Sequence, residues 1–387
     1  MPVLNRIAAF APQMTTWRRH LHAHPELAFD CVQTAAYITQ CLQEIGVDEI
    51  HTGIARTGIV AILNGATAGP TIGLRADMDA LPIVEATGAD HASITPGKMH
   101  ACGHDGHVTM LLGAAKYLAE TRRFCGRVAL IFQPAEEDGA GGQVMVQEGI
   151  MDRFDIAQVY GIHNAPNVPL GHFLTTPGAL MASVDTVFVH ISGKGGHGAT
   201  PHDCIDPVVA VVGMVQAIQT IIPRNVHALD EAVISVTQIH TGTASNIIPE
   251  TAMFCATVRA FKPEVRALLK KRIHEIINGH ALAYQVQARI DYDWGYPATV
   301  NHPDQAAFAI RAAAEIVGPA ATNGNSNREM GSEDFSYMLE ARPGAYLFMG
   351  IGPAAGLHHP AYDFNDEAAP IGAFFFARLV ERAQPLP

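Results

Sequence analysis

The chain has 387 residues, enough for two or three domains of about 150 residues each. Apolar residues make up 48% and charged residues 16%, so a large core can form and whole-chain disorder is excluded. With 25 Lys plus Arg against 37 Asp plus Glu, the net charge is −12, which argues against a surface that binds nucleic acid. The 20 histidines are a first indication of metal or proton chemistry.

The six cysteines are scattered and form no C-x-x-C pair, so we expect no disulfide scaffold and a reducing, cytoplasmic setting. Residues 1–10 lack the basic start and long apolar run of a signal peptide. The longest apolar run, residues 208–222, is shorter than the ~20 residues that a membrane span needs. We therefore expect no contact with a membrane.

Helical and strand-like segments alternate up to about Ala182. The expected elements are a helix from Ala35 to Ile45 closed by Gly46, strands at Ile59 to Leu63 and Thr71 to Ala76, a helix from Val108 to Ala119, and strands at Val128 to Phe132 and Gln158 to Ile162. Alternation of this kind predicts an α/β fold with a mixed sheet covered on both faces. The alternation resumes from Pro297 to Ala383.

Residues 183–294 follow a different order. The expected elements are a strand from Val184 to Ile191, a helix from Asp206 to Ile222 stopped by Pro223, strands at Ala232 to His240 and Thr251 to Arg259, a helix from Pro263 to Asn278 ended by Gly279, and a strand from Tyr284 to Tyr292. This β-α-β-β-α-β order is that of the ferredoxin-like split unit. We therefore predict an inserted domain at 183–294 within a larger domain of residues 1–182 and 295–387.

Acids, histidines or cysteines follow the ends of four apolar strands of the larger domain. They are Asp77 and Asp79, then Glu136 and Glu137, then His163, and finally His358, with Cys102 and His104 between the first two strands. Polar groups beyond the carboxyl ends of several strands can converge on one site. Thiolate, imidazole and carboxylate are all ligands of Zn²⁺, Mn²⁺ or similar ions, so this set predicts a metal site.

Local spacing divides the roles within this set. In an extended segment Cys102 and His104 point to the same side, so both can reach one metal. Glu136 and Glu137 would then face opposite ways, one binding metal and the other acting as general base toward substrate. Asp77 and Asp79 serve either as caps of a turn or as supports for a metal ligand.

We interpret three histidines near the start of the chain as structural and not as metal ligands. His20, His22 and His24 alternate before Pro25, but nothing nearby in the sequence completes a metal cage. In the inserted domain, the Gly-rich loop from Gly193 to His202 lacks the Walker pattern and can present His197 to a neighbouring site.

Two further residues of the inserted domain are candidates for substrate recognition. Asn246 offers an amide, and Arg259, at the end of an apolar strand, suits a substrate carboxylate or, alternatively, a surface ion pair.

Nine motifs spread along nearly the whole chain resemble the dinuclear metallopeptidase and amidohydrolase family of hippurate hydrolase, aminoacylases, auxin-amino-acid hydrolases and carboxypeptidase G-type enzymes. The motifs are Arg18 to Leu27, Leu74 to Pro82, Met99 to His107, Gln133 to Glu137, Gly161 to Pro166, Gly193 to His202, Ser245 to Pro249, Gly331 to Phe335 and Leu357 to Asp366. The resemblance implies an α/β catalytic domain with an inserted lid that often serves for dimerisation. It therefore implies a homodimer or tetramer formed through residues 183–294.

The resemblance also implies a division of roles among the site residues. Two divalent ions, Zn²⁺, Mn²⁺, Ni²⁺ or Co²⁺, would be bound by Cys102, His104, Glu137, His163 and His358, with His359 as an alternative to the last ligand. Glu136 would be the general base, and Asp79 the active-site Asp that supports the metal centre. His197, Asn246 and Arg259 would meet substrate, in the same chain or across a dimer.

The implied activity is metal-dependent hydrolysis of N-acyl or N-aroyl amino acids to a carboxylic acid and an amino acid. Glu136 would take the proton of the attacking water and return it to the leaving amine. The alternatives are a dipeptidase or carboxypeptidase of the same family and, more remotely, a metal-stabilised binding protein without turnover. A nicotinamide dehydrogenase is not supported, because residues 139–142 form no G-x-G-x-x-G.

Overall fold

The chain forms two compact units in a computed structural model, which describes residues 2–387 and the side chains from residue 5 on. The first unit contains the chain up to Leu180, Val300–Asn327 and Asp334–Pro387. The second contains Met181–Thr299 and Arg328–Glu333. Residues 328–333 belong to the second unit because the backbone there pairs with its start, where the N–H of Ala182 donates to the carbonyl of Glu329 (3.0 Å).

The first unit is built on an eight-stranded mixed sheet. In spatial order its strands are β1 (Glu49–Ile54), β2 (Gly58–Asn64), β4 (Cys125–Gln133), β3 (Thr67–Asp77), β5 (Ile156–Ala165), β16 (Gly344–Gly350), β6 (Phe173–Leu174) and β15 (Thr322–Asn323). The four strands β4, β3, β5 and β16 run parallel. Strand β2 is antiparallel to both β1 and β4, and β6 is antiparallel to β16 but parallel to β15. The predicted α/β fold with a mixed sheet is therefore confirmed.

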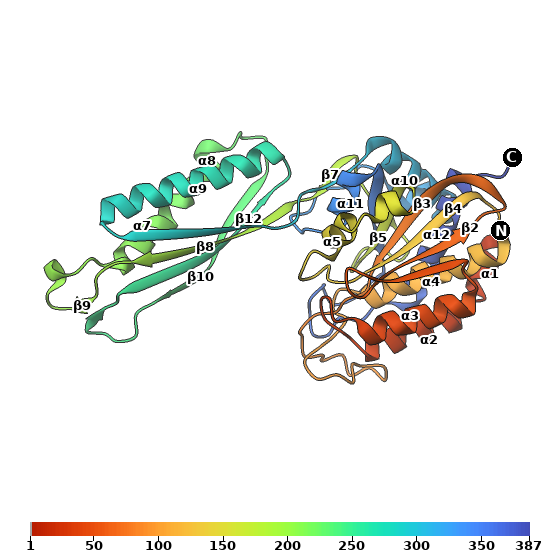
Figure 1. Cartoon of the computed structure of the whole chain (residues 1–387), viewed down its shortest axis with the longest axis horizontal. Coiled ribbons are helices and arrows are strands. Elements are labelled where there is room, and N and C mark those ends of the chain that lie inside the picture. The colour runs from red at the N-terminus through yellow and green to blue at the C-terminus, as the bar shows by residue number, and fades with distance from the viewer. Residues whose placement is uncertain (1) are drawn as a thin grey trace. The chain divides into compact units, whose positions relative to one another are not determined.

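Both faces of the central strands of this sheet are buried, which explains why β2, β4 and β16 are almost entirely apolar. In β2, Ile59 and Ala61 belong to the main core, while Val60 and Ile62 face the other way and are also fully buried. The long helices that contribute to the main core are α2 (Ala11–Ala23), α3 (Val32–Ile45), α4 (His104–Thr121), α10 (Pro303–Val317) and α12 (Ala369–Ala383). Of these, α2 and α3 lie beside α4 (Figure 1).

Shorter elements complete this unit. They are α1 (Pro2–Ala8), α5 (Gly141–Gln147), α6 (Ile150–Arg153), α11 (Ser336–Ala341) and 3-10 turns at Pro319–Ala321 and Asp366–Ala368. Helix α5 packs against α11 and β4. Two short strands, β7 (Gly178–Met181) and β14 (Thr299–Asn301), lie where the chain leaves the unit and returns to it.

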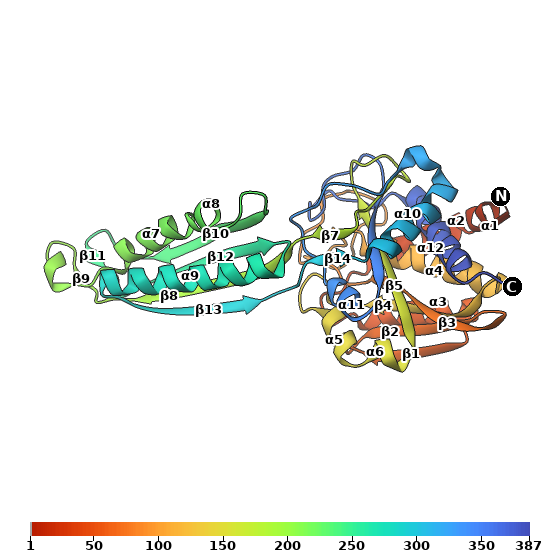
Figure 2. The same cartoon turned by 90° about the horizontal axis from the view of Figure 1, so that it is seen from above.

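The second unit is a four-stranded antiparallel sheet with helices on one face. Its sheet order is β10 (Ala232–Thr241), β12 (Thr251–Ala260), β8 (Ser183–Ser192) and β13 (Gln287–Trp294), and its helices are α7 (Pro207–Ile218), α8 (Ile221–Asn225) and α9 (Pro263–Tyr284). Figure 2 shows α7 and α9 lying along the strands, and their apolar side chains pack on Val187, Val189 and Ile191 of β8. The alternate residues of β8, among them Phe188 and His190, are only half-buried, so the other face of the sheet is open within this unit.

Two predicted helix ends in the second unit are wrong. Helix α7 stops at Ile218, and Pro223 lies in the first turn of α8, where a missing N–H breaks no helical hydrogen bond. Helix α9 continues through Gly279 to Tyr284, because Ala281 extends its buried stripe one turn beyond Ile277. The following strand consequently begins at Gln287 and not at Tyr284.

None of the helices within residues 2–387 is both long and apolar enough to cross a membrane.

Leucines at two positions of α9 give a matched test of this packing. Leu269 is fully buried against the sheet, whereas Leu282 is 83% exposed. Leu269→Ala should lower the free energy of unfolding by about 2–5 kcal/mol, because it removes buried methyl groups and leaves a cavity. Leu282→Ala should change it by less than about 0.5 kcal/mol. Urea unfolding followed by circular dichroism measures both, and equal effects would contradict the arrangement.

Candidate metal centre

The candidate ligands of the first unit meet at the carboxyl ends of the parallel strands. His163 lies in β5, Glu136 and Glu137 follow β4, Cys102 and His104 lie just before and at the start of α4, and His358 lies in the loop after β16. Three overlapping groups have ligand atoms within 4.8 Å of one another, namely Cys102 with His104 and His163, Cys102 with Glu137 and His358, and His104 with Glu136 and Glu137. The structure thus brings together side chains separated by up to 256 positions in the sequence.

Cys102 and His104 converge, although not for the reason expected from an extended segment. Gly103 between them has a φ of +88° and precedes the first residue of α4, so the backbone turns sharply there. A Cβ on Gly103 would lie 2.4 Å from atoms of Asn164 and Tyr362. Only glycine fits this turn, which leaves the Cys102 Sγ 3.4 Å from the Nε2 of His163.

The expectation that Glu136 and Glu137 face opposite ways is wrong. Both carboxylates reach the same cluster with His104. The chain turns after Ala135, whose φ is +56°, and the two carboxylate oxygens of Asp79 accept the N–H groups of Glu136 and Glu137, each at 3.0 Å. Asp79 therefore fixes the turn from which both glutamates project.

Hydrogen bonds at Nδ1 aim two imidazoles into the cluster. His104 Nδ1 lies 2.9 Å from the carbonyl of Asp79, and His163 Nδ1 lies 2.7 Å from the carbonyl of Asn164. A carbonyl can only accept, so each Nδ1 carries the proton and each Nε2 is directed inward. The buried His104 Nε2 makes no hydrogen bond, and the buried Glu137 Oε1 makes no well-aligned one, although His358 Nε2 lies 3.3 Å from it. Such atoms are expected where a metal ion binds.

The charges of the cluster also favour a cation. Burial, and then the nearby carboxylates of Glu137 and Glu136, raise the pKa of the Cys102 thiol well above its usual value. Although burial opposes it, the neighbouring Asp77 and Asp79 raise the pKa of His104 to about 10. A divalent ion supplies the positive charge that these groups otherwise obtain by keeping protons. The donor set and its charge therefore fit a metal centre.

Asp77 and His107 form a supporting pair rather than ligands. One oxygen of Asp77 accepts a hydrogen bond from Arg75 (2.6 Å), and the other from His107 Nδ1 (2.5 Å). The Nε2 of His107 in turn accepts the N–H of Asn164 at 3.0 Å. Because both ring nitrogens of His107 are engaged, this group holds the backbone that aims His163.

His358 faces the cluster and His359 does not. His358 Nε2 lies 3.3 Å from Glu137 Oε1, and the His358 N–H donates to the carbonyl of Ala101 (2.8 Å). The exposed His359 uses its Nδ1 to accept the N–H of Ala361. His358 has a φ of +61° and a side chain that is 54% exposed, which makes it the least enclosed of the five candidate ligands.

A second buried polar group adjoins the cluster and escaped the sequence interpretation. His22 is fully buried, with Nδ1 2.8 Å from Asp105 and Nε2 3.3 Å from Glu85. Burial lowers the pKa of His22, but the hydrogen bond and charge of Asp105 outweigh it and raise the pKa overall. The spacing of Arg18 and His22, four apart on one helix face, was the available signal. His20 and His24, by contrast, stack on each other at 4.4 Å.

The predicted substrate residues lie in the second unit. His197 and Asn246 come together at one end of it, where β9 (Gly196–His197) pairs with β11 (Ile247–Ile248) and the N–H of Gly198 donates to the Asn246 carbonyl. Arg259 lies near the opposite end of β12 and donates to the carbonyl of Met330 at 3.0 Å. A 3-10 turn at Pro201–Asp203 closes the Gly-rich loop.

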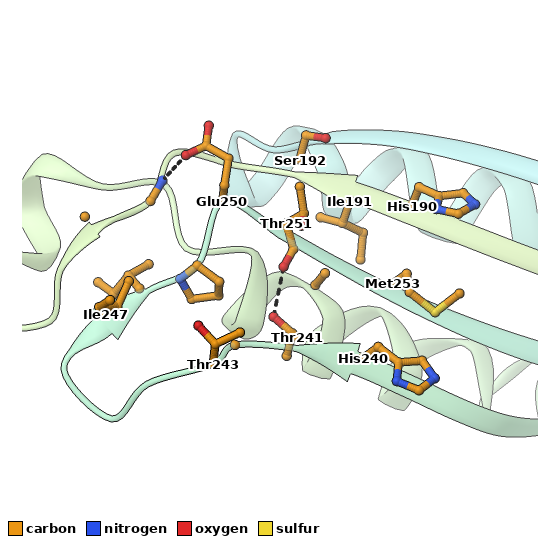
Figure 3. A pocket seen from close by; sticks show the side chains of 16 residues that line it. His190, Ile191, Ser192, His240, Thr241, Thr243, Ile247, Glu250, Thr251 and Met253 are labelled. Carbon is orange, nitrogen blue, oxygen red and sulfur yellow. Dashed lines mark hydrogen bonds between the residues drawn. The ribbon is translucent and has the colours of Figure 1, made fainter.

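A groove of about 830 Å³ borders the pair of His197 and Asn246. Figure 3 shows His190, Met253 and His240 side by side on neighbouring strands of the open sheet face. The carboxylate of Glu250 accepts the N–H of Gly195, which fixes the start of the Gly-rich loop.

Comparisons with known proteins agree with this arrangement. The family model for peptidase family M20/M25/M40 matches residues 73–382. The chain belongs to this family.

Two relatives with assigned names cover nearly the whole M20 chain. The N-acetyl-L-cysteine deacetylase of Bacillus subtilis is 39% identical over 98% of this chain and 89% of its own. The hippurate hydrolase of Campylobacter jejuni is 39% identical over 94% of each chain. Among solved structures, the Bacillus subtilis YXEP protein, described as a dinuclear metal binding peptidase from the M20 family, has a TM-score of 0.85, 34% identity and coverage of 97% and 99%.

The role of Asp79 in this M20 chain can be tested by removing one acceptor. Asp79→Asn puts an amide NH₂ against one of the two backbone N–H groups and leaves that donor buried and unpaired. The free energy of unfolding should fall by about 1–3 kcal/mol. The same change at the exposed Asp90 is the control, expected within about 0.5 kcal/mol of wild type. Chemical unfolding measures both, and an Asp79→Asn protein as stable as the control would refute this role.

Proposed function

We propose that this M20 chain is a metal-dependent amidohydrolase that cleaves N-acyl or N-aroyl amino acids into a carboxylic acid and an amino acid. The observation that carries the proposal is that Glu136, a buried carboxylate, lies beside the cluster of thiol, imidazole and carboxylate donors. The names of two relatives, a hippurate hydrolase and an N-acetyl-L-cysteine deacetylase, support the same class of substrate.

The proposed ligands are Cys102, His104, Glu137, His163 and His358, which would hold two divalent ions. The buried His104 Nε2, which makes no hydrogen bond, and the buried Glu137 Oε1, which faces His358, support this assignment, as does the description of the YXEP protein as dinuclear. A thiol, three imidazoles and a carboxylate accept Zn²⁺, Mn²⁺, Ni²⁺ or Co²⁺. When bound, such ions act as Lewis acids and lower the pKa of water toward ~7.

Glu136 would carry the proton in this reaction. Its carboxylate takes a proton from the water that attacks the amide carbonyl, and the new C–O bond forms at that carbon. It then gives the proton to the leaving nitrogen as the C–N bond breaks. Asp79 would not touch substrate, but it fixes the turn from which Glu136 projects.

The second unit would be a ferredoxin-like lid and dimerisation domain within residues 183–294. Its sheet order and its two helices on one face support the ferredoxin-like assignment. His197 would stabilise the oxyanion, Asn246 would contact substrate, and Arg259 would bind the carboxylate of the amino-acid half. A homodimer or tetramer would form through this unit, and the free thiols fit a cytoplasmic protein.

The proposed activity is tested with a panel of purified substrates and the metal-loaded protein. We expect turnover of N-benzoylglycine and N-acetyl amino acids, and little turnover of dipeptides with a free amino group. Glu136→Gln should lower kcat by about 10²–10⁴-fold with metal content unchanged, because only the proton carrier is lost. Glu340→Gln, the same change at an exposed position, should behave as wild type.

Other outcomes of this panel would count against the proposal. Preferential cleavage of free dipeptides would identify a dipeptidase instead, and normal turnover by Glu136→Gln would remove Glu136 from its role. Metal binding without turnover of any member of the panel would favour a non-catalytic binding protein.

The role of His197 has its own test. His197→Ala should lower kcat by about 10²–10³-fold, the usual effect of removing one oxyanion donor. His202→Ala is the matched control, because His202 lies in the same loop with a side chain that is 77% exposed. Steady-state kinetics and light scattering give kcat and oligomeric state together. A His197→Ala protein with normal kcat and unchanged assembly would refute the proposed role.

A further inference from the structure

Helix α2 carries a buried network of charged side chains that lies outside the candidate ligands. Arg18 is 1% exposed and His22 fully buried, although both side chains are polar. Four carboxylates surround them, from Glu85, Asp105, Asp363 and Asp366. Buried charges are costly unless they are paired, and the partners of these two side chains come from three other segments of the chain.

His22 joins α2 to the segment that carries two of the ligands. Its Nδ1 lies 2.8 Å from Asp105, the residue directly after His104. Its Nε2 lies 3.3 Å from Glu85, in the loop between β3 and α4. Because a carboxylate accepts at each ring nitrogen, the ring is best satisfied as an imidazolium that donates to both.

Arg18 joins the same helix to the segment that carries His358. Its Nε donates to Asp366 at 2.6 Å, and its Nη1 donates to Asp363 at 2.8 Å. The same Nη1 lies 3.8 Å from Asp105, so one guanidinium bridges both segments. A planar guanidinium can serve carboxylates on several sides at once, which a lysine ammonium on a flexible stem does less well.

Two more contacts tie the segment of His358 to the loop before α4. His91 Nε2 lies 3.1 Å from both oxygens of Asp363. The N–H of Ala86 donates to the carbonyl of Pro360 at 2.8 Å. The backbone of His358 is tied directly to Ala101, but its side chain is half-exposed, so these further contacts add to the hold on its segment.

We propose that Arg18 and His22 form a clasp, the α2 clasp, that holds the segment of His358 against the segment of Cys102 and His104. They are positioning residues. Their ion pairs and hydrogen bonds are with Asp105, Asp363, Asp366 and Glu85, and none of these is a candidate ligand. The inference rests on the proposed function, since it takes Cys102, His104 and His358 as metal ligands.

The test measures metal binding and not turnover. Apoprotein is titrated with Co²⁺, and the thiolate-to-cobalt absorption reports ions bound at Cys102. Arg18→Lys should weaken Co²⁺ binding by about 10–100-fold, the usual effect of losing a group that orients a metal ligand. Circular dichroism and thermal unfolding of the apoprotein show whether the fold is retained.

Arg19→Lys is the matched control. Arg19 bonds the same Asp366 at 3.0 Å, but its side chain is 48% exposed. An exposed ion pair contributes little, so this variant should lose less than about threefold in Co²⁺ affinity. Should Arg18→Lys fail to fold, Asp363→Ala removes the acceptor of the same link, at a side chain that is 37% exposed. Co²⁺ binding should again weaken, and unchanged binding would overturn the clasp.

A double-mutant comparison shows whether the clasp acts through His358. In a His358→Ala background, Arg18→Lys should weaken Co²⁺ binding little further, because the ring that it positions is already gone. If Arg18→Lys has the same effect in both backgrounds, or none in the wild-type background, the clasp is refuted. If wild-type protein shows no thiolate-to-cobalt absorption at all, the proposed metal centre fails first and the clasp falls with it.

Discussion

Two hydrogen bonds to one carboxylate determine the geometry on which the site depends. Asp79, two residues beyond β3, accepts the N–H groups of Glu136 and Glu137, which follow β4. Because β3 and β4 are parallel neighbours, their carboxyl ends lie at the same edge, and this link ties the residues after both strands together at one corner of the site. The carbonyl of Asp79 also orients His104, so a single residue aims a histidine and two glutamates at the same point. Contacts to the backbone thus determine the positions from which these side chains project toward one another.

The sequence predicted the sheet well because the strands of the first unit are buried on both faces. Continuous apolar runs such as Ile59 to Leu63 leave little choice of structure, and their carboxyl ends then locate the site. Helix ends were less predictable. Gly279 does not end α9, because buried packing continues the helix past it, and Pro223 lies inside the first turn of α8 instead of ending α7. Local spacing also misjudged Glu136 and Glu137, because the left-handed turn at Ala135 and the contact with Asp79 come from residues distant in the sequence.

His22 shows how far the sequence alone could predict the surroundings of the site. In the sequence it is one of three alternating histidines, and only its position four residues after Arg18 separates it from His20 and His24. The difference appears only when Asp105 and Glu85 arrive from other parts of the fold and take up its two nitrogens. Burial therefore distinguishes a histidine that holds a segment in place from one that stacks on the helix surface. The spacing puts His22 on the same helix face as Arg18, but it does not show that both side chains are buried.

The negative charge gathered at this corner has an effect beyond ligand binding. Burial together with Glu137 and Glu136 raises the pKa of the Cys102 thiol, and Asp77 and Asp79 raise the pKa of His104 against the effect of burial. A metal ion must therefore displace protons from both residues, which makes its binding compete with acid. In return, an ion that satisfies the buried Nε2 of His104 and Oε1 of Glu137 stabilises the folded state by mass action, because the unfolded chain offers no such arrangement. The buried donor groups of this cluster are thus costly to bury without a cation, and the same groups would bind the cation.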